Sequence, residues 1–354
     1  MRIAITGASG NIGTALLRRL STEGHQLVGL ARRTPEITPE GAQVEWVSAD
    51  LTGDSCIPTL ETAFTAADAV VHLAWGFQPS HDLTYLRELG VGGTRRVLEA
   101  VATAGVPHLV HMSSIGAYSP KRDDTPVDES WPTGGVRTSR YSVHKAAGER
   151  LLDDHERTGH DTLISRMRPG IVGQRSAGSS LLRYALPAIV PAAVLDHVPV
   201  LPLDRRLAVP MVHADDVADA IVRELGRRAG GAFNLAAEPP ITTQLVADAL
   251  GARSVHVPSF ALRPLMSAAW HARLQQVDTG WLDMAFALPL LDSSRAAREL
   301  GWSPTVDAES VLREVLEGMR EGDGRATPVL RPRSVVGALR DFAMRGPVGI
   351  RNRP

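Results

Sequence analysis

The stretch MRIAITGASGNIGTALLRRL, residues 1–20, decides the expected fold. Arg2 to Thr6 is a short apolar run with the length and β-branching of a buried strand. The loop Gly7-Ala8-Ser9-Gly10-Asn11-Ile12-Gly13 follows at once, and Leu16, Leu17 and Leu20 then recur at helical spacing. A strand, a glycine loop and a helix in this order predict a binding site for a dinucleotide.

Each of the three loop glycines has a physical role in such a site. Gly7 permits the tight turn, Gly10 lets the backbone approach a pyrophosphate, and Gly13 lets the helix lie close to the strand. Amide N–H groups at the helix N-terminus then face the phosphates. Glycine triplets also occur in ordinary strand-to-helix turns, so the prediction depends on the flanking strand and helix.

The composition is that of a globular protein: 354 residues, 44% hydrophobic and 22% charged, with a net charge of -1. A charge so close to zero gives no general attraction to nucleic acid or to an acidic membrane. Cys56 is the only cysteine, so we expect no intramolecular disulfide and no cysteine-based metal site, and we predict no metal ligands elsewhere. The first expected strand begins at residue 2, and the apolar run Tyr184 to Leu195 is too short to span a bilayer. We therefore expect a cytoplasmic protein that binds a small molecule.

The second expected strand, Gln26 to Ala31, bears on cofactor choice. In a dinucleotide fold an acidic residue at its end binds the ribose 2′-OH of NAD, whereas arginine suits the 2′-phosphate of NADP. Arg32 and Arg33 stand there, so we expect NADP, with NAD as the alternative. Two solvated loop arginines are the other interpretation in so arginine-rich a chain.

Strands and helices alternate through the next hundred residues. Strands are expected at 43–47, 69–73 and 108–112, with a helix at about 83–104. Asp50 follows the first of these strands, where it could recognise an adenine amino group or simply form a turn. Regular alternation predicts an α/β protein with a doubly wound parallel sheet of the Rossmann type, whose ligands bind at the carboxyl ends of the strands.

A tyrosine and a lysine share one helical face after a Pro- and Gly-rich loop at 119–140. Tyr141 and Lys145 are four residues apart at the start of a helix expected to run to about Arg157. The chain has four tyrosines, and Lys121 and Lys145 are its only lysines, so a chance pair at this spacing is rare.

These motifs together resemble an extended short-chain dehydrogenase/reductase, in the NAD-dependent epimerase/dehydratase group, over about residues 1 to 317. The matching segments are TGASGNIG, Asp50-Leu51, His72-Leu73-Ala74, Ser113 to Tyr118, Tyr141 with Lys145, Arg168-Pro169-Gly170, Val212 to Ala218 and Asp292 to Pro304. The resemblance implies that hydride passes between a nicotinamide and a substrate carbon.

The resemblance also implies the catalytic roles. Tyr141 would be the general acid/base, Lys145 would lower the pKa of that phenol, and Ser114 would donate a hydrogen bond to the substrate oxygen. Ser114 is preferred to Ser113 because the catalytic residue of the family lies four positions before the tyrosine of this motif, here Tyr118. The residues expected to contact the cofactor are Gly7, Ser9, Gly10, Asn11, Ile12, Gly13, Arg32, Arg33, Asp50, Leu51, Leu73, Ala74, Trp75, Tyr141, Lys145, Pro169, Gly170 and Ile171.

Departures from the family pattern narrow the substrate. Dehydratases carry an Asp-Glu pair where this chain has Ile115-Gly116, so dehydration is not expected. Nucleotide-sugar enzymes usually have an asparagine near Gly170-Ile171 and an arginine where this chain has Val209, and neither is present. Gly90 replaces the asparagine that the family carries in the helix before the fifth strand, which weakens one cofactor contact.

We expect a Rossmann domain at 1–173, completed by about 210–237, and a smaller C-terminal substrate lobe from 174–209 and 238–317. The lobe contains the apolar runs 181–195, 260–274 and 281–291, which suit a lobe core, a dimer face or an apolar pocket. Trp75 is a candidate pocket wall, with a core role as its alternative. Residues 318–354 form a basic extension, with a short helix expected at 334–344.

The sequence therefore predicts an NADP-dependent oxidoreductase acting on a carbonyl or alcohol of a small, fairly apolar molecule. A nucleotide-sugar epimerase with the same catalytic residues is the alternative, and a non-catalytic NADP-binding protein is a second alternative. By analogy with the family, a homodimer would pair through the helices at 83–104 and 141–157.

Overall fold

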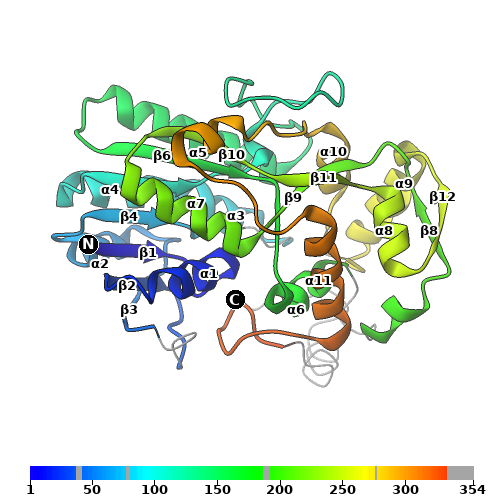
Figure 1. Cartoon of the computed structure of the whole chain (residues 1–354), viewed down its shortest axis with the longest axis horizontal. Coiled ribbons are helices and arrows are strands. Elements are labelled where there is room, and N and C mark those ends of the chain that lie inside the picture. The colour runs from blue at the N-terminus through cyan, green and yellow to red at the C-terminus, as the bar shows by residue number, and fades with distance from the viewer. Residues whose placement is uncertain (37–41, 77–79, 186–191, 276, 333–354) are drawn as a thin grey trace.

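The structure, a computed structural model, describes residues 1–36, 42–76, 80–185, 192–275 and 277–332. Its centre is a seven-stranded sheet in which all paired strands are parallel (Figure 1). In spatial order the strands are β10 (Gly231–Leu235), β6 (Leu163–Pro169), β5 (His108–Met112), β4 (Ala69–His72), β1 (Arg2–Thr6), β2 (Gln26–Ala31) and β3 (Val44–Ser48). The strand order reverses at β1, so the predicted doubly wound sheet is confirmed.

Helices cover both faces of this sheet because the inner strands are apolar on both sides. On one face α1 (Asn11–Leu20) packs against α7 (Ala214–Arg227), and their buried leucines, valines and isoleucines join the core of the sheet. On the other face lie α2 (Ile57–Phe64), α4 (Gly93–Ala104) and α5 (Arg140–Arg157). Figure 1 shows α1 and α7 side by side in front of the sheet.

The single helix expected at 83–104 is interrupted. The structure has α3 (Leu83–Arg87), one π-helical turn at Glu88–Gly92, and then α4. Three glycines within four positions, Gly90, Gly92 and Gly93, lower the helical propensity at this point. The Arg96 side chain also donates to the Glu88 carbonyl at 3.2 Å. The strand expected at 43–47 lies one residue later, at Val44–Ser48, and the strand expected at 69–73 ends one residue earlier, at His72.

The remaining elements form a smaller lobe beside the carboxyl edge of the sheet (Figure 1). Its strands are β7 (Ile171–Gly173), β8 (Val200–Leu203), β9 (Ala208–His213), β11 (Ala237–Thr242) and β12 (Arg253–His256). Strand β9 pairs with both β7 and β11, and β8 pairs with β12. Its helices are α6 (Gly178–Ala185), α8 (Thr243–Leu250), α9 (Ser259–His271), α10 (Thr279–Ala287) and α11 (Ala308–Glu321).

The apolar runs of the lobe have different environments. The described part of 181–195 packs with α11 in the lobe core, and α10 covers the loop after β5. The run at 260–274 does not contribute to this core, because α9 has no buried residue and Phe260 is 74% exposed. Trp302, expected in the lobe, instead belongs to the Rossmann core and donates its Nε1 proton to the Asp216 carbonyl at 2.8 Å.

The C-terminal extension is partly packed. Helix α11 continues beyond residue 317 and ends at Glu321, and the chain then returns so that Thr327 and Leu330 are buried. The helix expected at 334–344 lies outside the described residues. Within the described ranges we find no helix with the length and apolar character needed to cross a bilayer.

Candidate active site

A cavity of about 490 Å³ extends from the carboxyl ends of β1 and β4, where the strand order reverses, to the lobe. Ligands of open α/β sheets bind at this place because the helix N-termini and loops converge there. Its lining contains nearly all of the site residues predicted from sequence: Gly7, Ser9, Gly10, Asn11, Ile12, Gly13, Arg32, Asp50, Leu51, Leu73, Ala74, Trp75, Ser114, Tyr141, Lys145, Pro169, Gly170 and Ile171. Arg33 is the exception: it is exposed and is not part of the lining.

The glycine loop after β1 has the shape that a dinucleotide needs. Gly7 has a φ of 73°, and a Cβ added to it would lie 2.7 Å from the Ala74 amide nitrogen. A Cβ on Gly13 would lie 2.4 Å from the Gly7 carbonyl oxygen, so helix α1 can approach the strand only with glycine there. No side chain caps α1, which begins after Gly10, so its N-terminus suits a phosphate. These residues fit the pyrophosphate of a dinucleotide.

The two serines after β5 face different surroundings. Both serines line the cavity, but the Ser113 hydroxyl donates to the Glu149 carboxylate at 2.5 Å. The Ser114 hydroxyl accepts from the Gly116 amide at 3.0 Å and is hydrogen-bonded to the Tyr141 side chain. This geometry supports the choice of Ser114 over Ser113.

Tyr141 lies in the first turn of α5, where Ser139 caps the helix by accepting from the Ser142 amide. Its ring lies 5.1 Å from that of Trp281, centroid to centroid. Burial raises the pKa of Tyr141 to about 12, and the hydrogen bond from Ser114 opposes this shift. The expected lowering of this pKa by Lys145 is therefore not seen, because desolvation of the phenolate outweighs the other interactions.

Lys145 lies one turn after Tyr141 and is 3% exposed. Its ammonium group donates to the Met112 carbonyl at 2.8 Å and lies 3.7 Å from the centroid of the Trp75 ring. Burial lowers the pKa of Lys145 to about 7, although the nearby Glu149 acts in the opposite direction.

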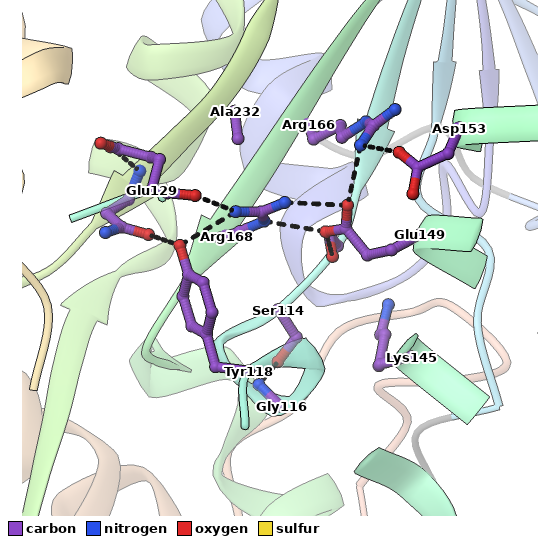
Figure 2. Close-up of polar contacts among 12 residues, drawn as sticks. Ser114, Gly116, Tyr118, Glu129, Lys145, Glu149, Asp153, Arg166, Arg168 and Ala232 are labelled. Carbon is purple, nitrogen blue, oxygen red and sulfur yellow. Dashed lines mark hydrogen bonds and ion pairs between the residues drawn. The ribbon is translucent and has the colours of Figure 1, made fainter. Parts of the chain in front are cut away.

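A buried network of charges, which was not predicted from the sequence, lies behind these residues. Figure 2 shows the Arg168 guanidinium between Glu149 and Tyr118. It donates to the two Glu149 oxygens at 2.8 and 2.9 Å and to the Tyr118 hydroxyl at 3.1 Å. Glu149 follows Lys145 by four residues on α5, and that spacing could have revealed it. The network ties β6 to α5 and to the loop that carries Ser114.

The lobe side of the cavity was not predicted residue by residue, because no local motif marks it. Its described lining residues come from β7, the segment 175–185, β9, the α10 region and the extension: Val172, Ala177, Ser180, Leu181, Val209, Pro210, Trp281, Met284, Ala285, Leu288, Val329 and Leu330. Tyr85, Leu86 and Leu89 close the cavity from the α3 side.

The fold and the position of the cavity define the class: a Rossmann-type dinucleotide-binding protein with a second lobe. The family model for the NAD dependent epimerase/dehydratase family matches residues 3–236. The chain belongs to this family, as its motifs predicted, and the family is one of NAD-dependent enzymes of the extended short-chain dehydrogenase/reductase type.

Known relatives agree with this assignment and differ in activity. The chain is 29% identical over 323 residues to an uncharacterised protein of Mycobacterium tuberculosis; the match covers 90% of the chain but 30% of that protein. It is 29% identical to a UDP-glucose 4-epimerase of Mycolicibacterium smegmatis, with 90% of the chain and 99% of the relative covered. It is 25% identical to a 3β-hydroxysteroid dehydrogenase/Δ5→4-isomerase of Mycobacterium tuberculosis, covering 89% of both.

Among solved structures, a UDP-glucose-4-epimerase from Stenotrophomonas maltophila with bound NAD and formylated UDP-arabinopyranose has a TM-score of 0.69 at 22% identity. That match covers 91% of this chain and 98% of the other. The similarity supports the fold.

Proposed function

We propose that this protein is an NADP-dependent oxidoreductase that acts on a carbonyl or alcohol group of a small, fairly apolar molecule. The observation that carries the proposal is the lobe side of the cavity. Among its described lining residues there is no charged side chain; Trp281, Met284, Leu288 and Leu330 provide apolar surface instead. A nucleotide diphosphate needs cationic or amide partners, whereas an apolar substrate gains from burial against such a wall.

Three side chains would carry the reaction. The nicotinamide would supply or accept the hydride. Tyr141 transfers the proton at the substrate oxygen, and Ser114, already bonded to Tyr141, donates a hydrogen bond to the same oxygen as negative charge develops there. Lys145, on the same face of α5, stabilises the phenolate that forms when the proton leaves.

The protonation state of Tyr141 suits the proton transfer of a reduction. With a pKa of about 12 the phenol holds its proton at neutral pH, so it is ready to donate that proton to a carbonyl oxygen.

NADP is favoured over NAD by a group of arginines at the adenosine end of the cavity. Arg32 lines the cavity and donates to the Tyr85 hydroxyl at 3.0 Å. Arg33 lies outside the lining; its pKa is lowered, first by partial burial and then by the positive charges of Arg32 and Arg331. A 2′-phosphate would relieve their mutual repulsion.

The cofactor proposal is tested with dissociation constants for NADPH and NADH, on protein checked for cofactor that co-purifies. We expect NADPH to bind more tightly, and Arg32→Ala to weaken NADPH at least about tenfold while leaving NADH nearly unchanged. Arg157→Ala, an exposed arginine of α5, is the matched control. Equal affinities, or tightly held NAD that co-purifies with the protein, would contradict the proposal.

A nucleotide-sugar epimerase is the second candidate, because the relative from Mycolicibacterium smegmatis is matched along nearly its whole length. The two candidates share the Ser114, Tyr141 and Lys145 set, so ligand binding must separate them. A UDP-sugar that raises the melting temperature at micromolar concentration would favour the epimerase, and a hydrophobic ketone that does so would favour the reductase.

A further inference from the structure

The ammonium group of Lys145 has an aromatic neighbour, Trp75, to which the proposed reaction assigns no role. Trp75 follows β4 in the loop that ends at the cavity, and its ring centroid is 3.7 Å from Lys145 Nζ. A cation is attracted to the face of an indole ring within about 6 Å, because the ring quadrupole places negative potential on that face. The contact joins a loop at the end of β4 to the first turns of α5.

The surrounding backbone leaves room for this indole. A Cβ added to Gly90, in the π-helical turn, would lie 3.1 Å from Trp75 Cε2. A Cβ added to Gly148, on α5, would lie 3.3 Å from Trp75 Cη2. A side chain at either glycine would therefore contact the ring. The absence of both side chains leaves the space that the indole occupies next to Lys145.

The titratable groups near Lys145 do not take the place of the indole as a partner for the ammonium group. His72 on β4 and His111 on β5 are buried; burial lowers the pKa of His72 to about 3 and that of His111 well below its ordinary value, so both are neutral at pH 7. Glu149, on the next turn of α5, raises the pKa of Lys145 but bonds directly to the two arginines of β6. Tyr141, one turn earlier, holds its proton.

We propose that Trp75 is a positioning residue, whose indole face binds the Lys145 ammonium group, favours its charged form and holds it at the cavity that Tyr141 also lines. The role in turnover rests on the proposed function, whereas the contact with the lysine does not. The indole and the Met112 carbonyl together hold a cation whose burial would otherwise favour the neutral amine.

The composition of the chain makes a direct test possible. Lys121 and Lys145 are the only lysines, so protein labelled with ¹³C at the lysine ε carbon gives two signals, whose shifts follow the ionisation of each amine. Lys121 is paired with Asp124 on the surface and is the internal reference. The titration is compared in wild type, Trp75→Phe and Trp75→Leu, and requires no substrate.

We expect Trp75→Leu to lower the Lys145 titration midpoint by roughly half to one and a half pH units. The midpoint in Trp75→Phe should lie between those of wild type and Trp75→Leu. If the indole acted only as an apolar cover, its removal would admit water and raise that midpoint. A raised or unchanged midpoint in Trp75→Leu therefore overturns the proposal. Trp281→Leu, which removes the other cavity tryptophan, should leave the Lys145 midpoint unchanged.

Two further measurements keep the result interpretable. If Trp75→Leu does not fold, uniform incorporation of fluorotryptophan keeps the ring shape and weakens the ring quadrupole, and it should lower the Lys145 midpoint in the same direction; no change would overturn the proposal. In the reductase assay, Trp75→Leu should lower kcat with less effect on KM and change the pH profile. If no substrate is turned over, the proposed function fails while the titration still decides the role of Trp75.

Discussion

The buried pair between Arg168 and Glu149 should dominate the stability of the region behind the active site. We consider Arg168→Met, which keeps the side-chain length and removes the charge. The substitution deletes two hydrogen bonds to Glu149, at 2.8 and 2.9 Å, and one each to the Tyr118 hydroxyl and the Glu129 carbonyl. It leaves a carboxylate that is 1% exposed without its main partner.

The expected loss follows from what remains. Removing one partner of a buried ion pair costs about 3–5 kcal/mol, because the other charge stays desolvated. Glu149 keeps the Ser113 hydroxyl at 2.5 Å and Arg166 at 3.3 Å, so we expect the lower half of that range. With about 2.1 cal/mol/K of unfolding entropy per residue and 354 residues, this loss lowers Tm by about 4–5 °C.

The assay is thermal unfolding by circular dichroism at pH 7, with Arg157→Met as the control. Arg157 pairs with Asp154 on the surface of α5, the helix that carries Glu149, and its side chain is 75% exposed. Its loss should therefore change Tm by less than about 1 °C. The double variant Arg168→Met/Glu149→Leu removes both buried charges and should recover at least half of the loss. A single variant that melts with the control, or a double variant that melts lower than the single one, refutes this reasoning.

Three further predictions concern the same site. Tyr141→Phe should lower kcat at least about 100-fold and leave the NADPH dissociation constant within about twofold, measured by steady-state kinetics and fluorescence titration; retained turnover would exclude Tyr141 as the proton donor. Gly13→Ala should weaken NADPH at least about tenfold, because the new methyl group would lie 2.4 Å from the Gly7 carbonyl, whereas Gly226→Ala, with no atom within 4 Å, should not. The folded pKa of Glu149 is depressed below 4.5, so its contribution to stability is complete above that pH and is lost as the pH falls through the folded pKa. The Tm of wild type should therefore fall more steeply below pH 4.5 than that of Glu149→Gln, and parallel curves would contradict this assignment.

The sheet, the dinucleotide loop and the candidate catalytic set could all be predicted from the amino-acid sequence. Each of these is a local pattern: the glycine loop lies between one strand and one helix, and Tyr141 and Lys145 share one helical face through their spacing alone. Parallel topology then brings the strand ends together at one edge, which is why all but one of the predicted site residues line a single cavity. The exception, Arg33, shows that adjacent residues at a strand end differ in direction, and periodicity could not decide which arginine faces the cavity.

Properties that depend on contacts between distant segments became clear only from the folded arrangement. Desolvation raises the pKa of Tyr141, whereas a lowered pKa was expected, because α10 and the loop after β5 pack against this partly buried side chain. The apolar run at 260–274 lies on the surface, although its composition suits a core as well. The return of the extension to the cavity at Val329 and the packing of Trp75 against Lys145 join segments far apart in the chain. No local pattern encodes such contacts, since they depend on how the lobe and the sheet pack against each other.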